Sequence, residues 1–297
     1  MNIEKPMEIL VRRRAAIGDV IMSTAVIREL KNRYGYNCHV DVATEFIEVY
    51  RNNPHVRNIY PAHVMPDPAK YDLFINLDDA YELNPVNHYV DSYMYRAFGS
   101  VDFDKRVELF PDQSDCASVE TDIEQIDRPF IVVHMRNWHW ASKNVSFDTW
   151  MQIFQELYTQ TTDVAVVCVG GDTDFALDQS PLFFDFRTRY NSQQMSYLIG
   201  QAECFVGIDS GPFQCAAATD TAIVALLTHL QPERIIPYRQ GVLGWNTQAV
   251  QTLEDCAGCN DDQVRPIRQL VCKKQTYPCS ANWDTRIIVQ KIMEQLT

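Results

Sequence analysis

The stretch 204-CFVGIDSGPFQCAAAT-219 decides the fold class of this chain. Residues 204–208 are apolar and typical of a buried strand, and residues 213–219 are typical of a helix. The turn between them, 209–212, carries a carboxylate, a hydroxyl and a glycine at the start of the helix, where free amide groups favour a phosphate. Although Asp-Ser-Gly is also a common turn, the pattern predicts a parallel α/β sheet with a ligand site at the carboxyl end of a strand.

A second junction of the same kind lies near the start of the chain. The apolar run 9–11 is followed by Gly18, Asp19 and a helix-like stretch at 23–33. Two such junctions predict two sites that face one cleft, the layout of an enzyme joining two substrates. The junction lacks the G-x-G-x-x-G pattern, which disfavours a nicotinamide-dependent oxidoreductase. From its position alone, Asp19 is interpreted either as a helix N-cap or as a catalytic group.

The length and composition of the chain fit two domains. A chain of 297 residues with 46% hydrophobic content supplies enough apolar surface for two cores of ordinary size. Short β-rich runs alternate with helical stretches on both sides of a polar segment. We predict an N-terminal α/β domain at 1–115, a linker at 116–128, a C-terminal α/β domain at 129–281 and a terminal helix at 282–297.

The formal net charge of −13 disfavours a nucleic-acid partner, because binding a polyanion draws on accumulated Lys and Arg. A short basic run at 12–14 supplies either solvated cations or ligands for a phosphate or an acidic substrate. Residues 1–8 lack the apolar core of a signal peptide, and no apolar run approaches the roughly 20 residues that span a bilayer. We therefore expect a cytoplasmic protein without a transmembrane segment.

Four of the nine cysteines gather near the end of the chain, as Cys256-x2-Cys259 followed by Cys272 and Cys279. A disulfide framework is not expected in a cytoplasmic chain. The first pair has the spacing of a structural zinc site, but six residues separate the last two, where such sites usually have about two to four. Structural zinc, reduced thiols and an oxidised pair all stay open.

Two cations follow the strand predicted at 130–134. Arg136 and Lys143 lie in the next loop, where each is either a partner for the phosphate at the second junction or a solvated loop cation. The intervening residues 138–140, Trp-His-Trp, either stack on a base or sugar or pack at a domain interface.

Taken together, these motifs resemble glycosyltransferase family nine, the ADP-heptose:lipopolysaccharide heptosyltransferases. In the N-terminal half the resemblance rests on GDV at 18–20, ST at 23–24, ELK at 29–31, VDVA at 40–43 and NPHV at 53–56. In the C-terminal half it rests on SYLI at 196–199, AE at 202–203, VGIDSGP at 206–212, AAA at 216–218 and IVAL at 223–226. Many members also carry a late cysteine cluster. The resemblance spans most of the chain in the same order.

The resemblance implies a GT-B fold, with two Rossmann-like domains facing a central cleft, the acceptor on the first and the nucleotide-sugar on the second. It also implies an inverting, metal-independent transfer with no cofactor required for catalysis. Asp19 matches the general base of the family, which takes the proton of the acceptor hydroxyl. The predicted donor contacts are Arg136, Lys143, Asp209, Ser210, Gly211 and Gln214, and the predicted acceptor contacts are Arg12, Arg14 and Ser23.

The chain also departs from the family pattern. Gln214 stands where members commonly have His, and residues 135–140 replace the usual small and hydroxyl-bearing residues. These departures leave the donor open. We predict transfer of a sugar from a nucleotide-sugar to a hydroxyl acceptor, such as the glycan of a lipopolysaccharide core. The alternatives are a phage-type glycosyltransferase acting on modified DNA bases, a nucleotide-sugar epimerase or hydrolase, and a non-catalytic nucleotide-sugar binding protein with a structural zinc module.

Overall fold

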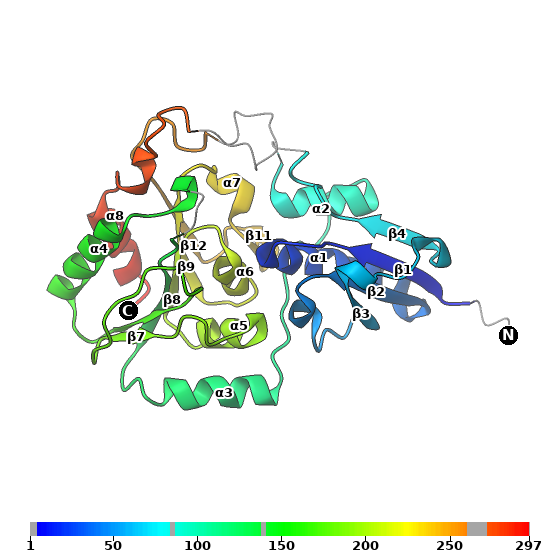
Figure 1. Ribbon diagram of the computed structural model, residues 1–297, viewed down its shortest axis with the longest axis horizontal. Coiled ribbons are helices and arrows are strands. Elements are labelled where there is room, and N and C mark those ends of the chain that lie inside the picture. Colours follow the sequence, from blue (N-terminus) through cyan, green and yellow to red (C-terminus); the bar gives the residue numbers. More distant parts are fainter. Residues whose placement is uncertain (1–4, 84–86, 138–140, 260–271, 297) are drawn as a thin grey trace.

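The computed structural model describes residues 5–83, 87–137, 141–259 and 272–296, and its strands form two parallel sheets that lie side by side (Figure 1). The N-terminal sheet has the order β3-β2-β1-β4, with β1 (Met7–Arg12), β2 (Cys38–Thr44), β3 (Asn58–Pro61) and β4 (Leu73–Asn76). The C-terminal sheet has the order β12-β9-β8-β5-β6-β7, with β5 (Phe130–His134), β6 (Ala165–Cys168), β7 (Phe183–Asp185), β8 (Cys204–Gly207), β9 (Ala222–Leu227) and β12 (Thr247–Gln251).

Helices cover both sheets and connect their strands. They are α1 (Ile17–Tyr34), α2 (Tyr89–Phe98), α3 (Gln113–Ile123), α4 (Phe147–Gln160), α5 (Ser192–Gly200), α6 (Gly211–Ala217), α7 (Pro232–Ile235) and α8 (Thr285–Met293). A short antiparallel hairpin, β10 (Tyr238–Arg239) with β11 (Val242–Leu243), follows α7. Among the described residues, no helix combines the length and the apolar character that crossing a membrane requires.

The central strands form because they are short runs of mostly apolar residues that include Val and Ile. The strands β5, β8 and β9 are buried along their whole length, as strands covered on both faces must be. Pairing places Arg12 beside Asn76 at the ends of β1 and β4, and His134 beside Gly207 at the ends of β5 and β8. The polar turns that follow these four strands therefore meet in two groups, which is the layout predicted from the two junctions.

The two sheets meet through α1 and α6. One continuous apolar core runs from β1 through α1 and α6 into the face of the C-terminal sheet. A Cβ atom at Gly211 would lie 2.7 Å from Ile17 Cγ2, so only glycine allows the starts of these two helices to come this close. The second core lies between the other face of the C-terminal sheet and the helices α4 and α8.

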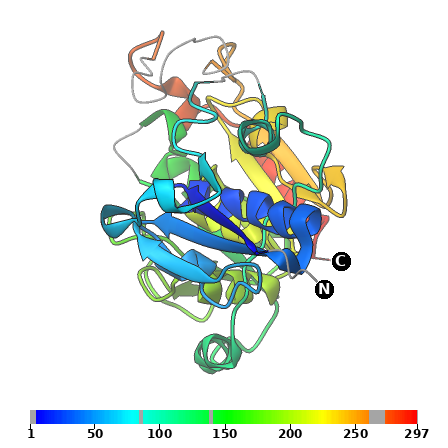
Figure 2. The same ribbon diagram turned by 90° about the vertical axis from the view of Figure 1, so that its right-hand side faces the viewer.

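The segment predicted as a linker, 116–128, is helical up to residue 123, because α3 extends into it. The Asp112 side chain caps the first turn, and only Asp115 and Val119 of the helix are buried. A helix with so few apolar contacts has no apolar periodicity to reveal it. It lies at the edge of the molecule opposite the segment 272–280 (Figures 1 and 2).

Candidate active site

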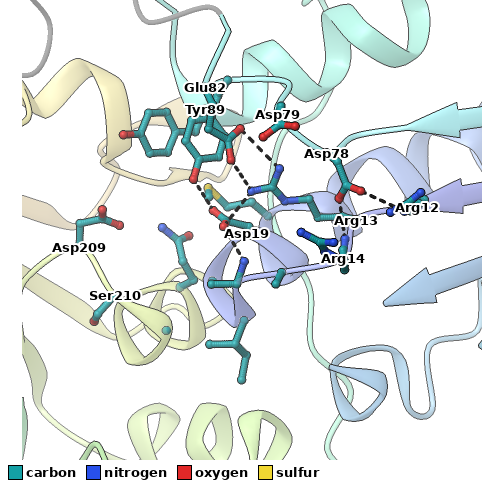
Figure 3. A pocket seen from close by; sticks show the side chains of 18 of the residues that line it. Arg12, Arg13, Arg14, Asp19, Asp78, Asp79, Glu82, Tyr89, Asp209 and Ser210 are labelled. Atoms are coloured by element: carbon teal, nitrogen blue, oxygen red, sulfur yellow. Dashed lines mark hydrogen bonds and ion pairs between the residues drawn. The ribbon is translucent and has the colours of Figure 1, made fainter. Parts of the chain in front are cut away.

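A cleft of about 650 Å³ lies where the polar turns of the two sheets face each other. Its N-terminal wall carries three arginines and four carboxylates, Arg12, Arg13, Arg14, Asp19, Asp78, Asp79 and Glu82. Its C-terminal wall carries the six predicted donor residues, Arg136, Lys143, Asp209, Ser210, Gly211 and Gln214. Figure 3 shows Asp19 between the arginines of one wall and Asp209 and Ser210 of the other. Predicted donor and acceptor residues that are about 190 positions apart thus share one cavity.

Asp19 is the third residue of α1, and three groups hold its carboxylate. Oδ2 accepts the N–H of Ala16 at 2.8 Å and pairs with Nη2 of Arg13 at 2.8 Å, while Oδ1 accepts the hydroxyl of Tyr81 at 2.8 Å. The N-cap itself is Ala16, whose methyl side chain accepts no hydrogen bond, so Asp19 supplies one half of a capping box by accepting the N–H of the N-cap residue and is not itself the N-cap. Because Asp19 also lines the cleft, it has a local structural role and is at the same time available to a substrate.

Arg13 is the buried centre of the N-terminal wall. Its guanidinium pairs with Asp19 and with Glu82 at 2.9 Å and donates to the carbonyl of Leu77 at 3.0 Å. Burial opposes its charge, but the side chains around it hold its pKa above the ordinary value. Burial also raises the pKa of Glu82, although the bond to Arg13 opposes this shift. Arg13 therefore pairs with two carboxylates at once and holds both in place.

Sequence reasoning missed these partners of Asp19. Tyr81 and Glu82 come from the turns that follow β4, and β4 pairs directly with β1. The one sequence feature near them is the acidic pair Asp78 and Asp79. The pairing of β4 with β1, which sequence spacing does not reveal, brings them to Asp19.

The predicted acceptor residues have different surroundings. Arg12 lines the cleft with Nε 2.9 Å from Asp78, and Arg14 lines it half-exposed, 3.7 Å from Glu45. Ser23 does not line the cleft. It is fully buried one turn further into α1, where its hydroxyl donates to the carbonyl of Val20 at 2.6 Å. The structure therefore corrects the expectation that Ser23 contacts an acceptor, because this side chain points into the core.

The cations of the C-terminal wall have acidic neighbours. The Nζ atom of Lys143 lies 2.6 Å from Oδ2 of Asp209. Burial would raise the pKa of Asp209, but the charge of Lys143 holds it below the ordinary value. Burial lowers the pKa of Arg136, an effect that Asp209 and Asp174 oppose. Because two cations and one carboxylate line this wall, its net charge is positive.

Ser210 and Gln214 present polar atoms to the cleft from α6. Ser210 is the N-cap, and its Oγ accepts the N–H of Phe213 at 3.3 Å and lies 2.9 Å from Nδ1 of His134. Gln214, one turn later, is 3% exposed, and its Nε2 has no hydrogen-bond partner among the described residues. A buried N–H group without an acceptor is costly. The departure from His to Gln thus keeps an N–H donor at the cleft.

The four late cysteines come together at one place. All of them line a small cavity beside Ser142 and Thr228 in the C-terminal half. Burial and the three neighbouring thiols raise the pKa of Cys279 to about 12. In the described part of the chain, the only three potential ligand atoms within 4.8 Å of one another belong to Glu254, Asp255 and Cys256. The four sulfurs therefore surround one cavity without forming a closed tetrahedron.

The tryptophan and histidine run at 138–140 lies outside the described residues. The predicted domain boundaries stay predictions, since the apolar core is continuous across the two sheets.

Comparisons with known proteins support these observations. The model of glycosyltransferase family 9 (heptosyltransferase) matches residues 70–259. No curated protein matches the chain. A family 9 glycosyl transferase from Veillonella parvula is similar in structure, with a TM-score of 0.76, 12% identity and 100% of this chain and 98% of that chain covered.

Two Escherichia coli enzymes are also similar. The iron-containing dodecameric glycosyltransferase TibC from an enterotoxigenic strain has a TM-score of 0.72 and 14% identity, over 100% of this chain and 80% of that chain. TibC has also been solved in complex with ADP-D-β-D-heptose. The ADP-heptose lipopolysaccharide heptosyltransferase II has a TM-score of 0.67 and 16% identity, over 98% of both chains. These likenesses confirm the predicted GT-B fold, with two α/β halves that face a central cleft.

Proposed function

The chain belongs to glycosyltransferase family 9 and is a glycosyltransferase, and from that premise we propose that it moves a sugar from a nucleoside diphosphate donor to an acceptor hydroxyl across the described cleft. One observation carries this proposal. Asp19 lies on one wall, and the cations Arg136 and Lys143 lie on the other wall of the same cavity. A carboxylate facing cations is what a transfer needs when a proton leaves the acceptor while negative charge gathers on the departing diphosphate.

The C-terminal wall suits a diphosphate donor. Arg136 and Lys143 supply charge, and the N–H group of Gln214, which has no hydrogen-bond partner in the described part of the chain, supplies a hydrogen bond. One structure of the similar TibC holds ADP-D-β-D-heptose. A structure of the Escherichia coli heptosyltransferase WaaC, which is similar in fold with a TM-score of 0.61 and 12% identity, holds ADP. We therefore propose an adenine nucleotide-sugar as the first donor to test. Protein cations would balance the developing charge of the leaving group, which supports a transfer that requires no metal for catalysis.

The N-terminal wall suits the attacking hydroxyl. We propose that Asp19 takes its proton, with Arg13 and Tyr81 holding the carboxylate oxygens in a fixed position. An acceptor held on this wall would approach the sugar from the side opposite the diphosphate. A single displacement from that side inverts the configuration of the anomeric carbon, and we propose this stereochemical course.

The charge of the N-terminal wall bears on the acceptor. Three arginines face four carboxylates there, and Arg12 and Arg13 each lie within 3 Å of a carboxylate oxygen. We therefore propose an acceptor whose reacting part is neutral or bears an amine. The predicted glycan acceptor, such as a lipopolysaccharide core, stays a prediction. The alternative acceptor, a base in DNA, is disfavoured by an acidic wall that would repel the phosphates.

We also propose that the four late cysteines hold a structural metal ion. Thiolates in one small cavity repel one another, and a divalent cation such as zinc or iron relieves that repulsion. The similar TibC is iron-containing. The ion would stabilise the fold of a segment that has few apolar residues of its own.

The cytoplasmic location predicted from the sequence stays a prediction.

Replacing Asp19 tests the proposed transfer. Asp19→Asn keeps the shape of the side chain but removes its basicity, so transfer should fall about 10²- to 10⁴-fold. Donor binding should be preserved, and we would measure it as the rise in melting temperature with ADP. The matched control is Asp79→Asn, which changes an exposed carboxylate of the same wall and should cost less than about tenfold. Transfer by Asp19→Asn at the wild-type rate would overturn the role of Asp19.

The assay begins with the donor. ADP-heptose and other nucleotide-sugars are each combined with neutral, amine-bearing and anionic acceptors, and both ADP release and the glycosylated product are measured. Failure of every nucleoside diphosphate to raise the melting temperature would contradict the proposed donor site. An epimerase, the remaining enzymatic alternative, would convert the donor without any acceptor.

A further inference from the structure

A buried chain of hydrogen bonds joins the C-terminal wall of the cleft, which we call the donor wall from here on, to the interior of the C-terminal half. The imidazole of His134, at the end of β5, has Nδ1 2.9 Å from Oγ of Ser210 and Nε2 3.0 Å from Oδ2 of Asp174. All three residues are less than one-tenth exposed, and Ser210 lines the cleft. The chain therefore ends at a hydroxyl that a ligand can reach. We call these three side chains the Ser210 relay.

The carboxylate of Asp174 fixes the proton on one side of the imidazole. Its Oδ2 also accepts the N–H of Gly171 at 2.7 Å, and its Oδ1 accepts the N–H of Asn137 at 2.9 Å. Burial would raise the pKa of Asp174, but its hydrogen bond to His134 and these amides lower it to about 2. A deprotonated carboxylate only accepts hydrogen bonds, so Nε2 of His134 carries a hydrogen. Whether Nδ1 also carries a hydrogen is linked to the direction of its hydrogen bond with Oγ of Ser210.

The backbone holds this ring in place. Gly170 has φ +135°, and a Cβ atom there would overlap Oδ2 of Asp174 and lie 2.9 Å from Cδ2 of His134. The main chain at this position thus lies directly against the imidazole and the carboxylate. The ring cannot turn away without moving β6 and its following loop.

The same positions of the heavy atoms accommodate two proton arrangements. When His134 is neutral, the hydroxyl of Ser210 donates to Nδ1, and Ser210 offers the cleft only a lone pair. When His134 is charged, Nδ1–H donates to Oγ, and the hydroxyl of Ser210 is free to donate into the cleft. A lone pair repels a phosphate oxygen, whereas a hydroxyl hydrogen attracts it.

We infer that His134 and Asp174 set the direction of the Ser210 hydroxyl, and that binding of a diphosphate draws one proton from solvent onto Nδ1 of His134. The inference rests on the proposed diphosphate donor. The proton balance is simple, since one proton leaves the solvent, none leaves the ligand and no bond between heavy atoms changes. His134 is a positioning residue, and Ser210 is the group that touches the donor.

The surrounding charges favour this coupling. Arg136, in the loop after β5, and Arg187, in the loop after β7, interact with Asp174 of the relay. Lys143, in the 3-10 turn Ala141–Lys143, and His229, in the loop after β9, interact with Asp209, which precedes Ser210. Arg136 and Lys143 are the cations that line the cleft together with Ser210. A bound diphosphate neutralises both cations and attracts the new charge. Burial lowers the pKa of His229 to about 3, so His229 stays neutral between pH 6 and 9.

Calorimetric titration with ADP tests the inference. Titrations in buffers of different ionisation enthalpy count the protons taken up at each pH from 6 to 9. At the upper end ADP is fully deprotonated and contributes none of its own. We expect the wild type to take up as much as one proton per ADP at some pH in this range. The affinity of the wild type for ADP should then fall by up to about tenfold for each unit by which the pH rises.

Three variants locate the proton. His134→Asn should bind ADP without proton uptake at the upper end of the range, and its affinity should no longer fall there. Ser210→Ala, a small change that keeps the imidazole, should lose most of the uptake. His229→Asn, which removes the other buried imidazole near the donor wall, should keep it. Proton uptake by His134→Asn equal to that of the wild type would overturn the inference.

Nitrogen NMR provides a readout that does not depend on the variants folding equally well. In the wild-type protein labelled with ¹⁵N-histidine, the Nδ1 resonance of His134 should move from the neutral to the protonated position when ADP is added. ADP binding without this change, and without proton uptake at any pH tested, would overturn the relay and leave the proposed function standing. Absence of binding by any nucleoside diphosphate would overturn both.

Discussion

Replacing Lys143 by methionine tests how the C-terminal wall of the cleft binds ADP. The affinity for ADP depends either on the charge of Lys143 alone or also on the neutralisation of Asp209 by Lys143. The Nζ atom lies 2.6 Å from Oδ2 of Asp209, and the two side chains are 15% and 12% exposed. Methionine keeps much of the apolar stem and removes the charge. The variant therefore leaves the carboxylate of Asp209 unneutralised beside the cleft.

The geometry sets the size of the effect. A phosphate oxygen in contact with the far side of Nζ would lie about 5 Å from the Asp209 carboxylate. Coulomb's law gives about 3 kcal/mol of repulsion at that distance with an effective dielectric constant of about 20. Lys143→Met also loses a charge-assisted hydrogen bond of roughly 1.5–3 kcal/mol. The lost hydrogen bond should lower ADP affinity about 10- to 150-fold, and removing the repulsion in the double variant Lys143→Met/Asp209→Asn should regain at least about tenfold.

The assay is calorimetric titration with ADP at pH 7.5, with a matched ion pair as the control. Lys105 has Nζ 2.6 Å from Oδ1 of Asp91, with side chains 12% and 18% exposed, and neither residue lines the cleft. Lys105→Met should change ADP affinity by less than about threefold. If the double variant binds ADP no better than Lys143→Met, repulsion from Asp209 is refuted. An equal loss in the control would show that the effect is not local to the cleft.

Three further predictions concern the interface, the relay and the cysteines. Gly211→Ala should destabilise the fold by about 1–3 kcal/mol by overpacking α1 against α6, and in urea unfolding Ile17→Ala should relieve that loss, whereas additive losses would contradict the close approach. Asp174, with its pKa lowered to about 2, stabilises the fold above pH 4, and this contribution is lost as pH falls towards 2. The melting temperatures of wild type and Asp174→Asn should therefore converge in acid, and a constant difference would argue against an ionised Asp174. Purified protein should contain about one metal ion per chain by elemental analysis, and Cys279→Ser should lose it and melt at a lower temperature, while metal-free wild type would refute the proposed site.

Local sequence patterns predicted much of the fold and of the C-terminal wall of the cleft. The family, the glycosyltransferase activity and the GT-B fold predicted from the motifs are confirmed. The strand, turn and helix at 204–219 is a local pattern, because apolar runs, turn residues and helix starts depend on neighbours in sequence. All six predicted donor residues line the cleft for the same reason, since they follow the carboxyl ends of adjacent strands.

The residues of the N-terminal wall of the cleft were less predictable from the sequence. The family resemblance placed Ser23 at the acceptor, but the packing of α1 directs its side chain into the core. The helix α3 was not recognised, because it buries only Asp115 and Val119 and has no apolar stripe.

Sequence alone thus determined which strands end in polar turns, and therefore which residues a cleft at those ends can display. Tertiary structure alone decided how those residues are paired. Arg13 meets Glu82 across 69 positions, and His134 meets Asp174 and Ser210 across 40 and 76 positions. Such pairs form only where sheet order brings two turns together, and burial then makes each partner necessary because an unpaired charge or polar group in the interior is costly. The sequence of one strand does not specify which other strand pairs with it in the sheet.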